Sequence, residues 1–279
     1  MLRDITIGQF YPGNSVIHKL DPRVKIVLTI AYIVMLFLAK NIFAYGLILL
    51  FSAFLIIVSR ISPRLIFKGL KPLIVIIVIT TILNIFYVKG TQVFPPISVF
   101  GWFDITITSE GIATAALMVI RITLLITTTS LLTYTTSPIE LTDGIERLLS
   151  PLKVIKVPVH EFSMMMTIAL RFIPTLIDET DKIIAAQKSR GSSFDEGGLI
   201  KRARALIPVL VPLFVSAFRR AEELATAMEC RCYVGGKGRT RMKSYKMAFR
   251  DYAALIVMAA LIAGVVLINV FLGSFIFSL

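Results

Sequence analysis

Two arginines stand at corresponding points of the chain, each closing a long, mostly apolar segment and each flanked by small residues. The two tripeptides are Ser189, Arg190 and Gly191 in "IAAQKSRGSS" and Cys230, Arg231 and Cys232 in "ATAMECRCYV". A guanidinium carries a permanent charge on a planar fork of N–H donors, which fits a carboxylate. Capping of a helix end is the other role for such a cation, worth about 0.3 to 1 kcal/mol through the helix macrodipole. The pattern leaves both roles open, docking into an acidic groove and helix capping.

The remaining polar patterns do not favour catalysis or metal binding. The only cysteines are Cys230 and Cys232 and the only histidines are His18 and His160, a set that does not favour a closed four-ligand zinc site. The stretch "GGKGRT" at residues 235–240 lacks the GxxxxGK[ST] spacing of a phosphate-binding loop. We therefore expect no enzymatic activity, no cofactor and no bound metal, and we expect the two cysteines to remain thiols.

The composition is that of a membrane protein. Hydrophobic residues make up 56% of the chain and the mean hydropathy is +0.83, values typical of membrane proteins. About 20 apolar residues in a helix cross a hydrocarbon layer of about 30 Å. The expected spans are residues 26–39, 42–59, 72–88, 111–136 and 253–277. The predicted fold is an all-α integral membrane protein with about five transmembrane helices, the first two joined in a tight hairpin at Lys40 and Asn41.

Lysine and arginine in the short loops predict the orientation, because cationic flanks stay on the cytoplasmic side. The loops before the first span and after the second contain Arg3, Lys19, Arg23, Lys25, Arg60, Arg64, Lys68 and Lys71. The opposite loops contain only Lys40 and Lys89. We expect a multi-pass protein of the cell membrane with a cytoplasmic N-terminus and, for an odd number of spans, an outside C-terminus. The loop 89–110 then forms an outward hairpin whose aromatic residues suit the membrane surface.

The segment 137–250 holds 19 of the 30 basic residues and is therefore expected in the cytoplasm. It contains apolar stretches of about 13 residues, which are too short to span a bilayer and which need cover by a partner. The chain thus divides into a membrane region at 1–136, a cytoplasmic region at 137–250 and a last span at 251–279.

Periodicity predicts three helices in this cytoplasmic region. Ser137 and Glu140 form the capping-box pattern at the start of a short helix. Apolar residues at three-four spacing then predict two long amphipathic helices, the first bent at Pro174. The predicted ranges are 138–149, 161–190 and about 202–231. Both long helices end on an arginine of the two tripeptides, and we expect Arg190 and Arg231 to be exposed in the isolated chain.

Arg121 lies about 15 Å into the fourth predicted span, where an unpaired charge costs several kcal/mol. Its side chain must therefore contact protein or water. It either forms a polar contact that steadies the helix bundle or moves with a partner subunit, or it simply pairs with a loop or carbonyl group. Basic residues between 237 and 250 precede the last span and are expected against anionic lipid head groups. Topology and lipid account for the net charge of +13, so no nucleic-acid partner is expected.

The chain resembles the transmembrane T component of energy-coupling factor transporters nearly from end to end. "SVIHKLDPRVKI" is similar to that family's approach to its first span. "TTSPIELTDGIERLLSPLKVIKVPVHEFSMMMTIALRFIPTLIDETDKIIAAQKSRG" is similar to its coupling region, and "LIPVLVPLFVSAFRRAEELATAMECRCY" is similar to its second long helix.

This resemblance implies a role for the two arginine tripeptides. In that family, tripeptides of the Ala-Arg-Gly kind dock into a pair of cytoplasmic ABC-type ATPases, and they correspond to residues 189–191 and 230–232. Serine and cysteine replace the usual small residues, so that size is kept. The resemblance also implies one substrate-binding membrane subunit, which ATP-driven movement of the coupling helices reorients during vitamin or transition-metal-ion uptake. The chain itself would be a non-catalytic scaffold.

A self-sufficient secondary carrier is the main alternative. Such a carrier places ionisable residues at mid-membrane and has paired, interrupted helices in two related halves. The predicted spans 26–39, 42–59, 72–88 and 253–277 contain no acidic residue, and no internal repeat is visible. A membrane-embedded transferase is a weaker alternative, because the spans hold no cluster of aspartate, glutamate or histidine. The resemblance assigns the choice of cargo to the separate binding subunit, so these residues do not identify the substrate.

Overall fold

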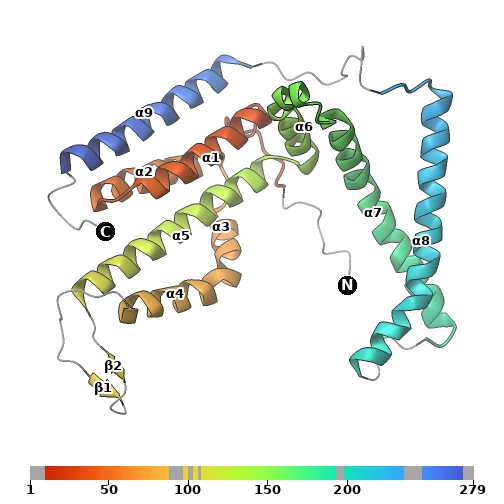
Figure 1. Ribbon diagram of the computed structural model, residues 1–279, viewed down its shortest axis with the longest axis horizontal. Helices are drawn as coiled ribbons and strands as arrows, with labels where there is room; N and C mark the ends of the chain where they lie inside the picture. Colours follow the sequence, from red (N-terminus) through yellow and green to blue (C-terminus); the bar gives the residue numbers. More distant parts are fainter. Residues whose placement is uncertain are drawn as a thin grey trace. The chain divides into compact units, whose positions relative to one another are not determined.

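The computed structural model describes residues 10–87, 97–99, 103–105, 108–192, 198–235 and 247–272 of the 279-residue chain (Figure 1). Packing divides them into two compact units. The membrane unit contains the described residues of 10–144 and 247–272, and the coupling unit contains those of 145–235. The predicted division at residues 137 and 251 concerns location relative to the membrane and stays a prediction.

Nearly all described elements are helices, as the predicted fold class requires. The membrane unit contains α1 (Pro22–Leu38), α2 (Ile42–Ser59), α3 (Pro63–Leu70), a 3-10 turn (Lys71–Leu73), α4 (Ile74–Tyr87), α5 (Ser109–Thr135), the start of α6 (Pro138–Leu148) and α9 (Phe249–Leu272). The coupling unit contains the rest of α6, a 3-10 segment (Ser150–Ile155), α7 (Val159–Ser189) and α8 (Leu199–Cys230). The all-α membrane class is confirmed.

A small sheet interrupts the helical pattern within the predicted outward loop. Strand β1 (Ile97–Val99) pairs antiparallel with β2 (Phe103–Ile105), with Ser98 opposite Asp104. The aromatic residues Phe94, Phe100 and Trp102 of this loop lie outside the described residues. The hairpin is therefore confirmed, while its place at the membrane surface stays a prediction.

Four helical segments of the described chain are long and apolar enough to cross a membrane. They are Ile42–Ser59, Pro63–Phe86, Ser109–Thr135 and Phe249–Phe271, which correspond to the second to fifth predicted spans. The first predicted span falls on α1, whose 17 residues measure about 26 Å and do not reach the roughly 30 Å of a hydrocarbon layer. Five spans were expected, and this comparison of length and composition supports four. Residues 88 and 273–277 of the predicted spans lie outside the described chain.

Helix α1 lies between α5 and α9 and contacts both (Figure 1). Its side chains Tyr32, Met35 and Leu36 are exposed by 1% or less and belong to the same apolar cluster as Tyr45 and Ile48 of α2. The depth of this packing explains how a helix of only 17 residues is held firmly in the bundle.

The tight hairpin predicted between α1 and α2 is confirmed. Helix α1 ends at Leu38, and Asn41 is the N-cap residue of α2. Asn269 of α9 closes the hairpin, because its amide donates to the carbonyl of Leu38 (2.7 Å) and accepts from the backbone N–H of Lys40 (3.3 Å). A carbonyl at the end of α1 thereby gains a partner that the helix itself cannot supply.

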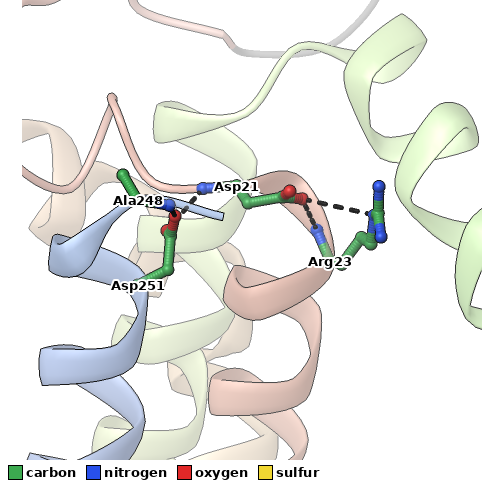
Figure 2. A network of polar contacts seen from close by, with 4 residues as sticks. All are labelled: Asp21, Arg23, Ala248 and Asp251. Atoms are coloured by element: carbon green, nitrogen blue, oxygen red, sulfur yellow. Dashed lines mark hydrogen bonds and ion pairs between the residues drawn. The ribbon is translucent and has the colours of Figure 1, made fainter. Parts of the chain in front are cut away.

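The N-termini of α1 and α9 are joined by buried carboxylates (Figure 2). Asp21, the N-cap of α1, accepts a hydrogen bond from the backbone N–H of Arg23 (3.0 Å). Asp251 in the first turn of α9 accepts from the N–H of Ala248 (2.8 Å) and from the N–H of Asp21 (2.9 Å). Both carboxylates lie where the helix macrodipoles favour negative charge. Residues 230 positions apart in the chain are thus fixed together.

Candidate functional site

Helices α7 and α8 of the coupling unit carry the two arginine tripeptides. With 31 and 32 residues, they measure about 46 and 48 Å. Figure 1 shows them running in opposite directions and meeting toward the C-terminal end of α7, so that their C-terminal ends lie at opposite ends of the pair. Both predicted long helices are confirmed, α8 starting slightly earlier than expected. Pro174 lies inside α7, where the expected bend stays a prediction.

A polar contact joins α7 to α8 away from the helix ends. Glu179 of α7 accepts hydrogen bonds from the Ser216 hydroxyl (2.7 Å) and the Arg220 guanidinium of α8. The Ser216 hydrogen bond, with the Arg220 charge, lowers the pKa of Glu179 below its ordinary value. Since a quarter of the Glu179 side chain is exposed (25%), water screens part of this attraction. The contact sets how the two helices sit against each other.

A second contact fills a gap that proline leaves in α8. Pro212 has no N–H, so it cannot bond the carbonyl of Pro208 one turn earlier. The side-chain amide of Gln187, near the end of α7, donates to that carbonyl at 3.4 Å. The proline inside α8 thus creates an acceptor that α7 uses.

Helix α7 ends in a Schellman motif with Arg190 at its C-cap. The N–H of Ser192 donates to the carbonyl of Gln187 (3.1 Å), and the N–H of Gly191 donates to that of Lys188 (3.0 Å). These two bonds satisfy carbonyls that a helix end leaves without partners. Gly191 has a φ of 87°, a left-handed conformation that glycine adopts without steric cost.

Helix α8 ends in the same motif with Arg231 at its C-cap. The N–H of Tyr233 donates to the carbonyl of Met228 (3.1 Å), and the N–H of Cys232 donates to that of Glu229 (2.8 Å). Cys232 has a φ of 52°, although a β-carbon in this conformation costs roughly 1–2 kcal/mol. The two helix ends therefore share one hydrogen-bonding pattern.

The shared motif gives a backbone reason for part of the small-residue pattern. The third residue of each tripeptide, Gly191 or Cys232, is in the left-handed position, which favours glycine whatever the helix end contacts. The first residue, Ser189 or Cys230, is helical and has no such restriction. Both arginines are exposed, as predicted for the isolated chain. Their role in docking to ATPases stays a prediction.

Large apolar residues on both helices are uncovered. In the first half of α7, Phe162, Met166 and Ile173, which the periodicity assigned to an apolar face, are exposed. In α8 the exposed residues are Leu206, Ile207, Leu210, Val211, Phe214, Val215 and Phe218. Contiguous apolar surface of this kind marks contact with a protein partner or a membrane. The predicted need for cover is therefore supported by the exposure of these side chains.

Arg121 contacts aromatic residues of neighbouring helices in the membrane unit. Its Nε donates to the hydroxyl of Tyr45 at 2.7 Å. Its guanidinium also lies over the rings of Tyr45 (5.6 Å to the centroid) and Phe37 (5.8 Å), within cation–π range. Of the roles left open by the sequence, this geometry favours a polar contact that steadies the bundle.

The cysteines and histidines occupy separate surroundings. Cys230 and Cys232 are exposed free thiols. His18 shares a hydrogen bond with the Ser15 hydroxyl (2.6 Å), and His160 lies 3.2 Å from a carboxylate oxygen of Glu146. Among the described residues, no group of three or more histidine, cysteine, aspartate or glutamate side chains gathers as a metal site. "GGKGRT" lies outside the described residues after Gly235, as do the basic residues 237–246.

Comparison with known proteins decides the family. Residues 13–242 match the CbiQ family, described as cobalt transport protein. The chain belongs to the CbiQ family. The energy-coupling factor transporter transmembrane protein EcfT of Ruminiclostridium cellulolyticum is 58% identical over 90% of this chain and 92% of its own length. EcfT of Clostridium kluyveri is 53% identical over 98% of this chain and 100% of its own length. EcfT of Thermosediminibacter oceani is 52% identical over 94% of this chain and 97% of its own length.

Membership of the CbiQ family confirms the resemblance to the transmembrane T component of energy-coupling factor transporters. Relatives with that name match this chain over nearly their whole length. The long apolar helices agree with a transmembrane component. A transmembrane transport component of a multi-subunit transporter fits a scaffold rather than an enzyme. The relatives' name refers to a transporter of which the protein is one component.

Sequence reasoning missed the contact between Glu179, Ser216 and Arg220. Ser216 and Arg220 are four residues apart in α8 and so lie on one face, opposite a carboxylate of α7. The only signal in the sequence is the presence of these polar residues within largely apolar helices. It does not indicate which residue pairs with which.

Proposed function

We propose that the chain is the non-catalytic scaffold of an ATP-driven importer and docks one cytoplasmic ABC-type ATPase at each arginine-capped helix end. Arg190 and Arg231 each form a forked contact with a carboxylate in a groove of an ATPase. Closure of the ATPases on binding ATP shifts α7 relative to α8, and this movement reaches a separate substrate-binding membrane subunit. The cargo belongs to the vitamin or transition-metal-ion class.

The two matching helix ends carry this proposal. Each presents an exposed arginine held at the C-cap by the same pair of backbone hydrogen bonds. Because the ends lie at opposite ends of an antiparallel pair (Figure 1), one acceptor cannot readily hold both, and two separate acceptors suit them. Helix capping alone explains one such arginine, but it gives no reason for two exposed copies on helices of about 46 to 48 Å.

The contacts between α7 and α8 suggest how movement passes through the pair. Glu179 binds Ser216 and Arg220 well away from both helix ends. With this contact intact, a shift at one end is passed to the other as a change of crossing angle. The scaffold therefore transmits force between the ATPases rather than absorbing it.

The uncovered apolar residues of α7 and α8 support a further partner, the substrate-binding membrane subunit. Phe162 and Met166 of α7 and Phe214 and Phe218 of α8 are exposed. A polypeptide that leaves aromatic side chains uncovered on long helices needs an apolar partner to avoid aggregation. A membrane-embedded subunit provides such a surface. Because it would contact both helices, a change in their crossing angle would displace it.

Replacement of the two arginines tests the docking. Arg190→Ala and Arg231→Ala should each weaken ATPase association by about 2–5 kcal/mol, the cost of breaking a buried charge pair. Lysine should restore binding only in part, since it lacks the planar fork. Association is measured by titrating purified ATPase subunits onto the full chain in detergent, alongside ATP-dependent uptake in liposomes.

Exposed arginines elsewhere on the same helices provide the matched controls. Arg171→Ala in α7 and Arg219→Ala in α8 remove the same charge away from the helix ends and should leave association within about twofold, as surface changes usually do. If the variants at Arg190 and Arg231 assembled and transported like the parent, the docking role would be wrong. Equal losses in all four variants would indicate a general charge effect instead.

The secondary carrier is tested by the same preparation. A self-sufficient carrier would move substrate in liposomes containing this chain alone, whereas the proposed scaffold requires ATPases and a binding subunit. The proposed orientation has the N-terminus and α8 end in the cytoplasm and the C-terminus outside, which requires the short α1 to act as a fifth span. The exposed thiols of Cys230 and Cys232 report the side of the α8 end, because an impermeant thiol reagent labels them only from the cytoplasmic face.

A further inference from the structure

A cationic face lies where α3 leads into the membrane-spanning helix α4. Arg64, Lys68 and Lys71 are separated by four and three residues, which places them on one face of two successive helical turns. All three side chains are exposed. Residues 60–71 contain no acidic residue, and none of the three cations takes part in an ion pair within the described part of the chain.

The inner face of α3 is fixed to α5, so the cations are held outward. Ile66 is buried and packs with Leu131 and Tyr134 of α5. The Tyr134 hydroxyl also donates to the backbone carbonyl of Leu65 at 3.3 Å. The orientation of the cationic face therefore follows from packing on the opposite side of the helix.

A shallow groove of about 720 Å³ lies beside these cations. Its lining includes Arg64, Phe67, Lys68, Lys71, Ile74 and Ile77. The cations come from α3 and the turn after it, whereas Ile74 and Ile77 belong to the first turns of α4. Phe67 and Ile74 are exposed large apolar side chains. The groove thus joins a positively charged mouth to an apolar floor that continues along a membrane-spanning helix.

We propose that this groove binds an anionic phospholipid of the bilayer, with its phosphate on Arg64, Lys68 and Lys71 and an acyl chain along the apolar floor. Clustered cations at the end of a membrane helix attract anionic head groups, and Arg64 can bind phosphate oxygens through its planar fork. Free phosphate matches the cations but leaves Phe67 and Ile74 uncovered. An acidic soluble protein also leaves the part of the groove on α4 unfilled. A phospholipid satisfies both halves of the site.

Lipid retention tests the site in the full chain with any subunits that co-purify. The protein is reconstituted in nanodiscs of equal parts phosphatidylglycerol and phosphatidylcholine, extracted into mild detergent, and analysed by native mass spectrometry for bound lipid. The parent should retain phosphatidylglycerol in preference to phosphatidylcholine. The triple variant Arg64→Gln, Lys68→Gln, Lys71→Gln should lower that preference by about tenfold or more, because each cation contributes to head-group binding.

Three further variants separate a specific site from general charge. The triple variant Arg171→Gln, Arg204→Gln, Arg219→Gln removes as much charge from exposed positions of α7 and α8 and should keep the preference. Lys68→Arg with Lys71→Arg should also keep it, which shows that loss in the glutamine variant is not misfolding. Phe67→Ser with Ile74→Ser should lower lipid retention with all three cations present.

Several results would overturn the proposal. They are a parent without preference for phosphatidylglycerol, an equal loss in the two triple glutamine variants, or unchanged retention after Phe67→Ser with Ile74→Ser. Loss of a co-purifying protein subunit from the Arg64, Lys68 and Lys71 variant in lipid-free detergent would assign the cations to a protein interface instead. The proposal rests only on membrane insertion and remains valid if the docking role of Arg190 and Arg231 is wrong.

Discussion

Cys232 holds in α8 the position that Gly191 holds in α7. Each follows an arginine C-cap, and their φ angles are 52° and 87°. Each N–H donates to the carbonyl three residues earlier, Gly191 to Lys188 and Cys232 to Glu229. A β-carbon in this left-handed conformation is sterically unfavourable, and glycine avoids that cost. The two helix ends are therefore alike in hydrogen bonding but unequal in backbone strain.

This inequality predicts opposite effects of two substitutions. Cys232→Gly should stabilise the end of α8 by up to about 1 kcal/mol, the relief of strain being partly offset by the greater freedom of glycine in the unfolded chain. Gly191→Ala should destabilise the end of α7 by about 1 kcal/mol. Hydrogen exchange of the amides at residues 191–192 and 232–233 measures both. Slower exchange in Gly191→Ala than in the parent would contradict the prediction.

The ends of α7 and α8 were predictable because their signals are local. An arginine followed by glycine, or by a turn containing "YVGGKG", stops an amphipathic pattern within a few residues. The same holds for the hairpin after Leu38, where two residues with little apolar character interrupt a long apolar run. Local composition determines these features, so the chain sequence alone suffices to locate them.

The missed features depend on residues distant in the chain. Glu179 and Arg220 are 41 positions apart, and Asp21 and Asp251 are 230 apart, so no local pattern pairs them. The shortness of α1 was missed because hydropathy reports apolar length but not how deeply a helix packs. The third span begins at Pro63 rather than at Pro72, because a 3-10 turn at Lys71–Leu73 continues α3 into α4.

Asp251 is expected to be the most sensitive of the buried carboxylates at the helix N-termini. Asp251→Ala leaves the buried N–H of Asp21 and the part-buried N–H of Ala248 without their acceptor, at a cost of about 1–3 kcal/mol, which comes mainly from the buried donor. Asp251→Asn keeps one acceptor oxygen and should lose less. The midpoint of thermal unfolding in detergent measures both. Asp178→Ala, at an exposed position, is the control, and an equal midpoint for Asp251→Ala and the parent would show that the link is not needed.

Arg121 and Tyr45 should be energetically coupled. Tyr45→Phe removes the hydrogen-bond acceptor but keeps the ring, and it should cost about 1 kcal/mol. Arg121→Lys keeps the charge but loses the planar group that lies over Phe37 and Tyr45, at a similar cost. The double variant should be less destabilised than the sum of the two, as measured by unfolding in detergent. Strict additivity would show that the 2.7 Å contact contributes nothing of its own.

The contact of Glu179 with Ser216 and Arg220 predicts a pH dependence for the α7–α8 pair. Hydrogen bonding by Ser216, with the charge of Arg220, holds the pKa of Glu179 below its ordinary value of 4.5. A group whose pKa is lower in the folded state stabilises that state fully above its unfolded value, so this stabilisation is present above about pH 4.5 and is lost as the pH falls through the folded value.

Glu179→Gln isolates this contribution, because glutamine cannot ionise. The parent should exchange amide hydrogens in α7 and α8 more slowly than the variant at neutral pH, by less than about fivefold, since a partly exposed ion pair contributes no more than about 1 kcal/mol. The difference should shrink below pH 4.5 as the parent's carboxylate becomes protonated. A difference that stayed constant through this range would mean that Glu179 acts through its size and shape, and the crossing of the two helices would then not depend on its charge.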